Sequence, residues 1–172
     1  VLALHQSGIE NVVASSGTSL TQRQIQMVKR FTANLTVIYD GDKAGIKASL
    51  RGIDLILEEE MNVKVVPLPD GEDPDSFSKK MSPEELKDYI KDKEIDFIKF
   101  KTHLLFQETQ NDPVERARLI SSIVRSITII PNNIIRAEYF KECSTILQVG
   151  EDVLYAEASK IKSQRDAQNK KR

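Results

Sequence analysis

The sequence is poor in the features that mark secreted, membrane-spanning and disulfide-stabilised proteins. Its 172 residues contain one cysteine and no tryptophan, and aromatic residues make up only 6%. A lone cysteine, Cys143, cannot support a disulfide framework, so it predicts a reducing compartment and a buried thiol. No apolar run approaches the roughly 20 residues of a membrane helix, and nothing resembles a signal peptide. We therefore expect a cytoplasmic, soluble protein with no membrane partner.

The chain also has little net charge. Its 25 lysines and arginines nearly balance 26 aspartates and glutamates, which leaves a net charge of −1. No overall field therefore attracts it to nucleic acid, which argues mildly against a freestanding DNA-binding protein. A metal site that meets phosphates through bound cations is compatible with this balance. The length allows a buried core in one domain or in two small ones.

Two acidic clusters are the most informative feature, because each follows a strand-like run. Residues Leu35–Tyr39 are apolar and rich in β-forming residues, and they end at Asp40-Gly41-Asp42. A second run, Val63–Leu68, is followed by Asp73 and Asp75. Such short runs, bounded by glycine and charge, are typical of buried strands.

The segment between the two runs predicts how the strands are related. Residues 43–57 carry apolar side chains at helical spacing. Strand, helix and strand within roughly thirty residues form a βαβ unit, which predicts parallel strands and a right-handed crossover. Parallel strands end at one edge of the sheet, where open α/β sheets bind ligands. Both acidic clusters are therefore expected at one edge.

Four carboxylates at one edge indicate a metal site. They would repel one another strongly unless cations lay between them. Mg²⁺ or Mn²⁺ fits, because Mg²⁺ prefers oxygen ligands and is commonly shared with phosphates. Two such ions about 4 Å apart are a common arrangement for in-line phosphoryl displacement. The predicted ligands, which are also the predicted catalytic residues, are Asp40, Asp42, Asp73 and Asp75.

A purely structural role for these acids is the alternative. Aspartate at a strand exit often caps the following helix, and Asp-Gly and Pro-Asp-Gly sequences are common in turns. Either cluster alone fits this interpretation well. The presence of both on one predicted edge favours the metal site.

Three further residues are candidates for binding a nucleotide. Residues 11–15 are predicted as a strand, and Gly17 and Thr18 lie in the loop that follows it. Gly17 would let backbone N–H groups approach a phosphate or a base, although a simple turn explains it equally well. Lys43 opens a predicted helix, where positive charge is unfavourable unless an anion such as a triphosphate lies nearby. Pairing of Lys43 with the neighbouring aspartates is the alternative.

The remainder of the sequence is predicted to be helical. Ser82-Pro-Glu-Glu85 and Asp112-Pro-Val-Glu115 have the capping-box pattern with proline at the first helical position. In the first part we expect helices over residues 1–6, ended by Gly8, and 21–31, with Ile25, Val28 and Phe31 buried. The five helices expected in the second part form a small bundle and span about 83–91, 94–109, 113–128, 133–148 and 151–165.

The acidic segments carry a family resemblance. Tyr39–Gly45 and Pro69–Asp75 resemble the second and third motifs of the Toprim domain, in the version found in bacterial DnaG-type primases. Asn11–Thr21 resembles the loop that precedes them. The resemblance covers about the first eighty residues, and its Gly-Glu-Asp-Pro-Asp motif is specific to primases. The family's first motif carries a glutamate that would lie before Val1, so we interpret the chain as a truncated fragment that cannot prime alone.

The resemblance implies both architecture and activity. It implies an α/β Toprim subdomain with a mainly parallel sheet over residues 1–80, an all-α helical bundle over 81–165 and a basic linker tail over 166–172. The implied activity is Mg²⁺- or Mn²⁺-dependent synthesis of short RNA primers from ribonucleoside triphosphates on single-stranded DNA during replication. In this family a replicative helicase binds through a C-terminal domain, which this sequence does not include.

Two other functions remain open from the sequence. Asp40-Gly41-Asp42 after an apolar strand also fits the nucleophile and acid of a haloacid-dehalogenase-type aspartate phosphotransferase. Against this, Ala44 stands where such enzymes usually carry threonine. The other alternative is a non-catalytic binding module, in which the acids only form turns and the bundle binds a partner.

Overall fold

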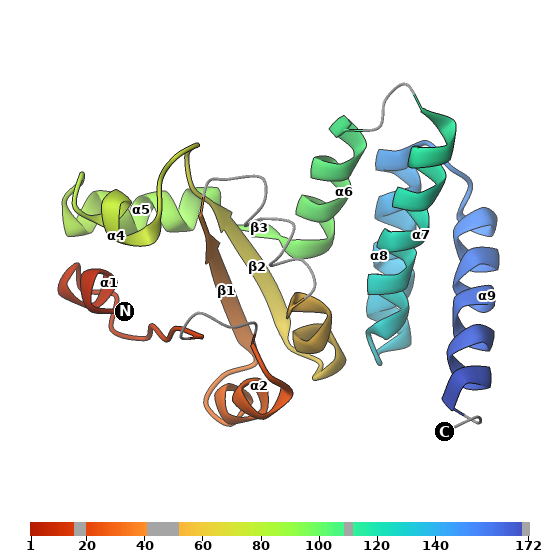
Figure 1. Ribbon diagram of the computed structural model, residues 1–172, viewed down its shortest axis with the longest axis horizontal. Helices are drawn as coiled ribbons and strands as arrows, with labels where there is room; N and C mark the ends of the chain where they lie inside the picture. Colours follow the sequence, from red (N-terminus) through yellow and green to blue (C-terminus); the bar gives the residue numbers. More distant parts are fainter. Residues whose placement is uncertain (16–19, 41–51, 109–111, 170–172) are drawn as a thin grey trace. The chain divides into compact units, whose positions relative to one another are not determined.

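The computed structural model describes residues 1–15, 20–40, 52–108 and 112–169. It divides into two compact units, Val1–Asp96 and Phe97–Arg172 (Figure 1). The first unit is mixed α/β and the second is helical, as the sequence predicted.

A small sheet organises the first unit. Its strands β1 (Asn34–Tyr39), β2 (Asn62–Pro67) and β3 (Ile95–Asp96) lie in the order β1-β2-β3. β1 and β2 are parallel, with Asn34 opposite Asn62 at the start of the register (Figure 1). β3 pairs antiparallel with β2. The parallel pair predicted from the two apolar runs is therefore confirmed.

Strand β2 forms the buried centre of the sheet. Val63, Val65 and Val66 are at most 3% exposed, which fits a strand covered on both faces. Residues 52–58, which carry no label in Figure 1, are helical and bury Ile53, Ile56 and Leu57. They confirm the end of the helix predicted over 43–57, whose earlier part, up to residue 51, lies outside the described residues.

Helix α2 (Gln22–Lys29) lies between the described N-terminal segment and β1 in the sequence. Thr21 caps it through the N–H of Gln24, and the Gln24 side chain accepts from the N–H of Thr21 at 2.9 Å. Ile25 is 1% exposed, as predicted, but Phe31 is 89% exposed. The prediction for Phe31 was wrong because the helix ends at Lys29, so helical spacing no longer places Phe31 on the buried face.

An apolar cluster packs short helices near the carboxyl ends of the parallel strands. Its buried members, Leu4, Leu68, Phe77 and Leu86, come from α1 (Leu2–Gln6), the segment after β2, α4 (Pro74–Ser78) and α5 (Pro83–Lys93). The Tyr89 hydroxyl of α5 donates to the Pro67 carbonyl at 3.1 Å. Helix α1 confirms the predicted N-terminal helix, and Gly8 follows it at a φ of 75°, which glycine adopts readily.

The segment over residues 11–15 is not a strand, contrary to the prediction. Val12 packs against the apolar cluster, whereas Val13 is 67% exposed. No described strand pairs with this segment. A strand depends on a hydrogen-bonded neighbour, and the alternation of side chains cannot supply one.

Helix α5 belongs to the first unit, although the sequence analysis grouped it with the bundle. Leu86 is 2% exposed within the apolar cluster, and the following β3 pairs with β2. The structure therefore divides after Asp96, whereas the sequence suggested a division after residue 80.

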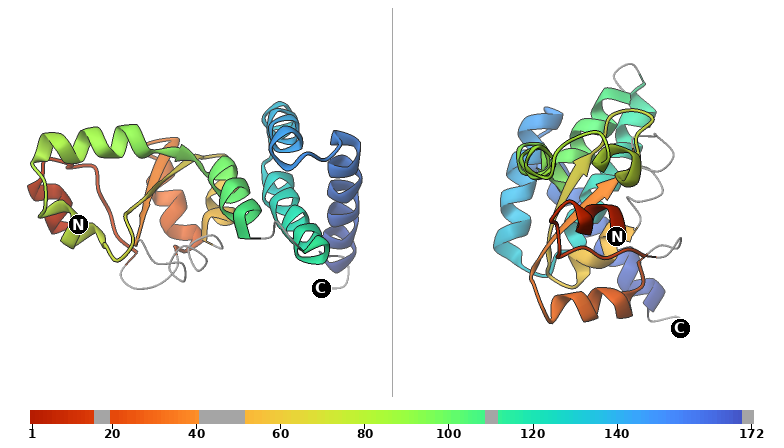
Figure 2. Two further views of the ribbon diagram at one scale, coloured as in Figure 1. Left: turned by 90° about the horizontal axis from the view of Figure 1, so that it is seen from above. Right: turned by 90° about the vertical axis from the view of Figure 1, so that its left-hand side faces the viewer.

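The second unit is a bundle of α6 (Phe97–Glu108), α7 (Pro113–Ile129), α8 (Asn133–Leu147) and α9 (Glu151–Asn169). Helices α7, α8 and α9 run side by side, and α6 packs on α7 and α8 (Figure 2). The predicted bounds are confirmed to within a few residues, except that α9 continues through Asn169 where a linker was expected. None of the described helices is long and apolar enough to cross a membrane.

Several contacts hold the bundle together. Its most buried residues come from all four helices, and Asp112 caps α7 by accepting the N–H of Val114 at 2.8 Å. The Nζ of Lys101, a buried side chain on α6, donates to Ser126 Oγ of α7 at 2.7 Å. Cys143 is buried, as predicted. The apolar residues of the bundle with 0% exposure are Phe97, Ile123, Val124, Ile127, Leu147 and Leu154.

Residues 97–172 expressed alone should therefore fold, because these helices bury one another. We expect a helical far-ultraviolet circular dichroism spectrum and a cooperative thermal transition. In this segment Ile123→Ala should cost about 2–5 kcal/mol, because it leaves a cavity in the core. Adding residues 82–96 should not raise the Tm. A coil spectrum, or a Tm that rises with the longer segment, would contradict this division of the chain.

Candidate functional site

The parallel register places the ends of β1 and β2, from which the two acidic segments continue, at one edge of the sheet. Tyr39 and Pro67 are register partners at the ends of β1 and β2. Asp40, which is exposed, directly follows β1, and Asp73 and Asp75 follow β2. The other predicted site residues lie outside the described residues: Asp42, Lys43, Gly17 and Thr18.

A tight turn connects β2 to the second acidic segment. The Glu72 N–H donates to the Pro69 carbonyl at 3.0 Å. Gly71, the third residue of this turn, has a φ of 79°, a backbone conformation that side chains disfavour. The Pro-Asp-Gly sequence is therefore a turn, as the structural alternative held, and it leads the chain directly into α4.

Asp73 caps α4. Its Oδ1 accepts the N–H groups of Asp75 and Ser76, both at 2.8 Å, and its own N–H donates to Ser76 Oγ at 3.1 Å. Pro74 occupies the first helical position, where its missing N–H costs nothing. Both hydrogen bonds that the Asp73 side chain accepts use Oδ1. The same carboxylate can therefore cap the helix through Oδ1 and bind a metal ion through Oδ2.

Asp75 forms an exposed ion pair with Lys79, four residues further along. The distance from Asp75 Oδ2 to Lys79 Nζ is 2.6 Å, and the two side chains are 62% and 69% exposed. The hydrogen bond and charge of Asp75 raise the pKa of Lys79. This lysine therefore stays cationic beside the predicted ligand.

Glu72 forms a second, more enclosed pair. Its side chain is 16% exposed, pairs with Lys80 and accepts Ser76 Oγ at 2.8 Å. The hydrogen bonds from Lys80 and from Ser76 lower the pKa of the Glu72 carboxyl. Through Ser76 and Lys80, Glu72 therefore links the turn to α4 and to the residues that follow it.

The position of α4 is set by its buried face. Phe77 and Ser78 are 6% and 5% exposed, and the Phe77 ring lies 4.7 Å from that of Tyr89 on α5. Ser78 Oγ donates to the Asp75 carbonyl at 3.0 Å. A helix anchored in this way holds Asp73 and Asp75 in fixed positions.

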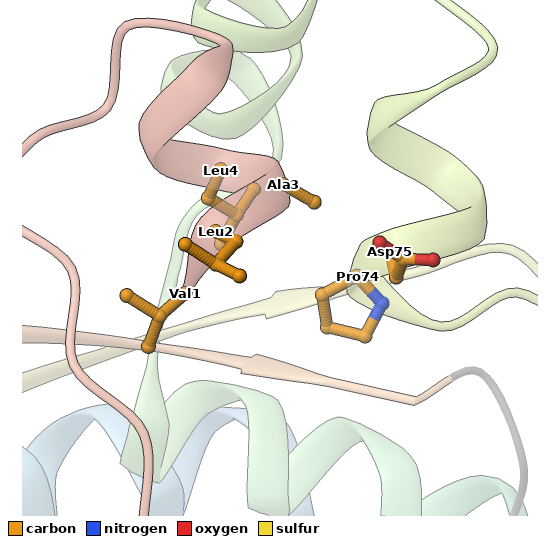
Figure 3. Close-up of a pocket in the computed structure, with 6 residues that line it drawn as sticks. All are labelled: Val1, Leu2, Ala3, Leu4, Pro74 and Asp75. Carbon is orange, nitrogen blue, oxygen red and sulfur yellow. The ribbon is translucent and has the colours of Figure 1, made fainter.

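A hollow of about 320 Å³ lies between α1 and α4. Asp75 is at its edge, and aliphatic side chains of α1 face it from the other side (Figure 3). One carboxylate against an aliphatic wall does not make a metal site. The lining residues are Val1, Leu2, Ala3, Leu4, Pro74 and Asp75.

The donor chemistry of this edge fits a hard divalent cation. Asp40, Asp73 and Asp75 offer only carboxylate oxygens, which Mg²⁺ and Mn²⁺ accept. Within the described residues, however, no three histidine, cysteine, aspartate or glutamate side chains come together as a metal site. These three aspartates therefore do not complete a site by themselves.

The partners of these acids were not predicted from the sequence. Glu72, Lys79 and Lys80 were not named as site residues, although Asp75 and Lys79 have the spacing of neighbours on one helical face. The four-residue spacing of Asp75 and Lys79 could therefore have predicted this ion pair from the sequence.

Comparison with known proteins gives consistent matches. Residues 1–78 match a family model described as Toprim-like. The DNA primase of Listeria monocytogenes is 35% identical over 145 residues, which cover 83% of this chain and 23% of that protein. The DNA primase of Halalkalibacterium halodurans is 32% identical over 171 residues, 98% of this chain and 28% of that protein. The chain thus spans about a quarter of the length of these relatives.

Solved structures show the same similarity. A DNA primase domain from Pseudomonas aeruginosa has a TM-score of 0.78 and 27% identity, with 92% of this chain and 51% of that chain covered. The E. coli primase catalytic core has a TM-score of 0.74 and 32% identity, covering 87% and 49%. A DnaG primase catalytic domain bound to single-stranded DNA has a TM-score of 0.74 and 30% identity, covering 88% and 49%.

Because Asp73 caps α4, Asp73→Ala should destabilise the chain by about 1 kcal/mol, whereas Asp73→Ser should retain most of the cap. Urea unfolding of both variants and of Asp75→Ala, whose side chain is exposed, measures the difference. Asp75→Ala should resemble the parent chain. Equal losses for Asp73→Ala and Asp73→Ser would show that the cap is not what Asp73 contributes.

Proposed function

Because this chain belongs to the family of bacterial DnaG-type DNA primases, we propose that it forms part of a catalytic core that synthesises RNA primers on single-stranded DNA. The observation that carries the proposal is the parallel β1–β2 pair, because both acidic segments continue from strands that end at one edge of the sheet. The similarity to primase catalytic cores supports it. The activity belongs to the longer protein, of which this chain represents a part.

The proposed site consists of carboxylates that hold Mg²⁺ or Mn²⁺. Asp73 contributes Oδ2, since Oδ1 is used by the cap, and Asp75 contributes from the first turn of α4. Asp40 and Asp42 contribute from the end of β1. Bound Mg²⁺ or Mn²⁺ would neutralise the triphosphate and lower the pKa of the attacking 3′-hydroxyl. The rigid attachment of α4 keeps its two ligands in place, so that little rearrangement accompanies the reaction.

Binding of the nucleotide is assigned to three residues that lie outside the described part of the chain. Gly17 and Thr18 follow the N-terminal segment, and Lys43 follows Asp42. A lysine beside metal-binding carboxylates suits a triphosphate, and a glycine allows close approach of backbone N–H groups. We assign these three residues to the ribonucleoside triphosphate.

The proposed partners follow from the activity. One of the similar structures is a primase catalytic domain bound to single-stranded DNA, which supports a single-stranded template as the partner of the longer protein. A replicative helicase is proposed to bind through a C-terminal domain outside this sequence. We place the protein in the cytoplasm, where bacterial DNA is replicated.

The two alternative functions gain no support. The relatives and structures described above are primases, so they favour neither an aspartate phosphotransferase nor a non-catalytic module. The second acidic segment does contain the turn and the cap of the structural alternative. The cap uses Asp73 Oδ1 only, so Asp73 Oδ2 can still bind a metal ion.

In the full-length primase, Asp40→Asn should lower primer synthesis by orders of magnitude, because it removes a negative charge at the proposed metal. Template binding should hardly change, since affinity for phosphates comes mainly from lysines and arginines. Primer extension assays and binding of labelled single-stranded DNA measure the two effects, with a thermal melt to check folding.

Asp88→Asn is the matched control, because Asp88 is an exposed aspartate on α5, away from the proposed ligands in sequence. It should leave both quantities unchanged. If Asp40→Asn primes at the parent rate with an intact melt, Asp40 is not a metal ligand. If Asp40→Asn also abolishes template binding, the acid acts through structure, and the binding module becomes the better interpretation.

A further inference from the structure

Two neighbouring lysines at the end of α4, Lys79 and Lys80, form ion pairs of different character. Lys80 pairs with Glu72, whose side chain is 16% exposed and is also held by Ser76 Oγ at 2.8 Å. Lys79 pairs with Asp75, and both of these side chains are more than 60% exposed. The Lys80 pair therefore belongs to a small fixed network, whereas the Lys79 pair lies open to solvent.

The open pair lies on the side of α4 that faces away from the core. Asp75 and Lys79 are four residues apart, hence on one helical face. Phe77 and Ser78, which are buried, anchor the other side. Breaking the Asp75–Lys79 pair thus requires no movement of the helix. Exposed pairs of this kind contribute little to stability, so the pair is easily opened.

A divalent cation and Lys79 compete for the same carboxylate. Lys79 Nζ lies 2.6 Å from Asp75 Oδ2, so a cation bound to either oxygen of this carboxylate would lie close to the positive charge of Lys79. A directly coordinated cation with two charges would repel the ammonium group at this distance. The long, flexible lysine side chain can then turn away while its charge stays near the sheet edge.

We propose that Lys79 is an exchangeable counter-ion of Asp75: it neutralises the carboxylate before metal binds, and after displacement it pairs with the triphosphate of the incoming nucleotide. Lys79 is in this account a positioning residue for the metal and a binding residue for phosphate. The inference rests on the proposed function, because it assumes that Asp75 is a ligand. Lys80, in contrast, has a structural role.

The first test is Mn²⁺ binding to the 172-residue chain, measured by isothermal titration calorimetry. Lys79→Gln removes the competitor and should raise the Mn²⁺ affinity roughly two- to five-fold, the range expected from the loss of an exposed ion pair. Lys79→Arg keeps the charge and should restore the parent affinity. Lys80→Gln should lower the thermal midpoint without raising the affinity.

Lys141→Gln is the matched control, because Lys141 is an exposed lysine on α8 in the other unit. It should change neither the affinity nor the melt. A merely structural role for Lys79 would lower metal affinity on mutation or leave it constant, and would not raise it. An increase in Mn²⁺ affinity in Lys79→Gln therefore distinguishes the counter-ion role from a structural role.

The second test is binding of ATP to the chain at saturating Mn²⁺. Lys79→Gln should weaken it several-fold, since a charge that pairs with phosphate is lost. Unchanged ATP affinity would overturn the phosphate role of Lys79. Unchanged or lower Mn²⁺ affinity in Lys79→Gln would overturn the counter-ion role.

Asp75→Asn separates this inference from the proposed function. If Asp75→Asn weakens Mn²⁺ binding but Lys79→Gln does not strengthen it, Asp75 remains a ligand and only the role of Lys79 falls. If Asp75→Asn leaves Mn²⁺ binding unchanged, Asp75 is not a ligand. The inference about Lys79 is then wrong, and so is the assignment of Asp75 to the proposed metal site.

Discussion

The rest of the site depends on the parallel pairing of β1 with β2. The register runs from Asn34 opposite Asn62 to Tyr39 opposite Pro67, so both strands end together and their acidic continuations leave from one edge. Burial favours this register, because a shift by one residue would move Val63 and Val65 to the positions where Asn62 and Lys64 are exposed. A helix-linked crossover is the type of connection that makes such pairing feasible. The chemistry at the edge thus follows from the packing of apolar residues.

Helix α4 shows how structural and functional roles can share one short segment. Asp73 ends the turn and caps the helix through Oδ1, and Phe77 anchors the same helix in the apolar cluster. Because the cap occupies one oxygen, the second remains for a cation. Asp75 is held differently, by a lysine that solvent reaches easily. Because Lys79 can leave Asp75 while Asp73 stays in the cap, a cation could bind both carboxylates without unfolding α4.

Local signals in the sequence were predicted well, and non-local ones were not. The caps at Ser82 and Asp112 depend on residues a few positions apart, and the structure confirms them. It also contains the turn at Gly71 that the structural alternative described. The strand expected over residues 11–15 was wrong because it needed a partner strand that local sequence does not reveal. The helix over residues 83–91 was predicted, but the surface on which it packs was not. Asp42, Lys43, Gly17 and Thr18 stay predictions, and the Asp75–Lys79 pair was overlooked although its spacing was readable.

The most direct measurement of the central claim is the position of Mn²⁺ in a crystal of this chain, located by anomalous diffraction. The account predicts a peak within about 2.0–2.6 Å of carboxylate oxygens of Asp40 and Asp75, the range of oxygen ligands to hard divalent cations. It also predicts that the Asp75–Lys79 ion pair is open in that crystal. A peak at other residues, with Lys79 still paired to Asp75, would contradict the claim that the parallel strands gather a metal site at their common edge.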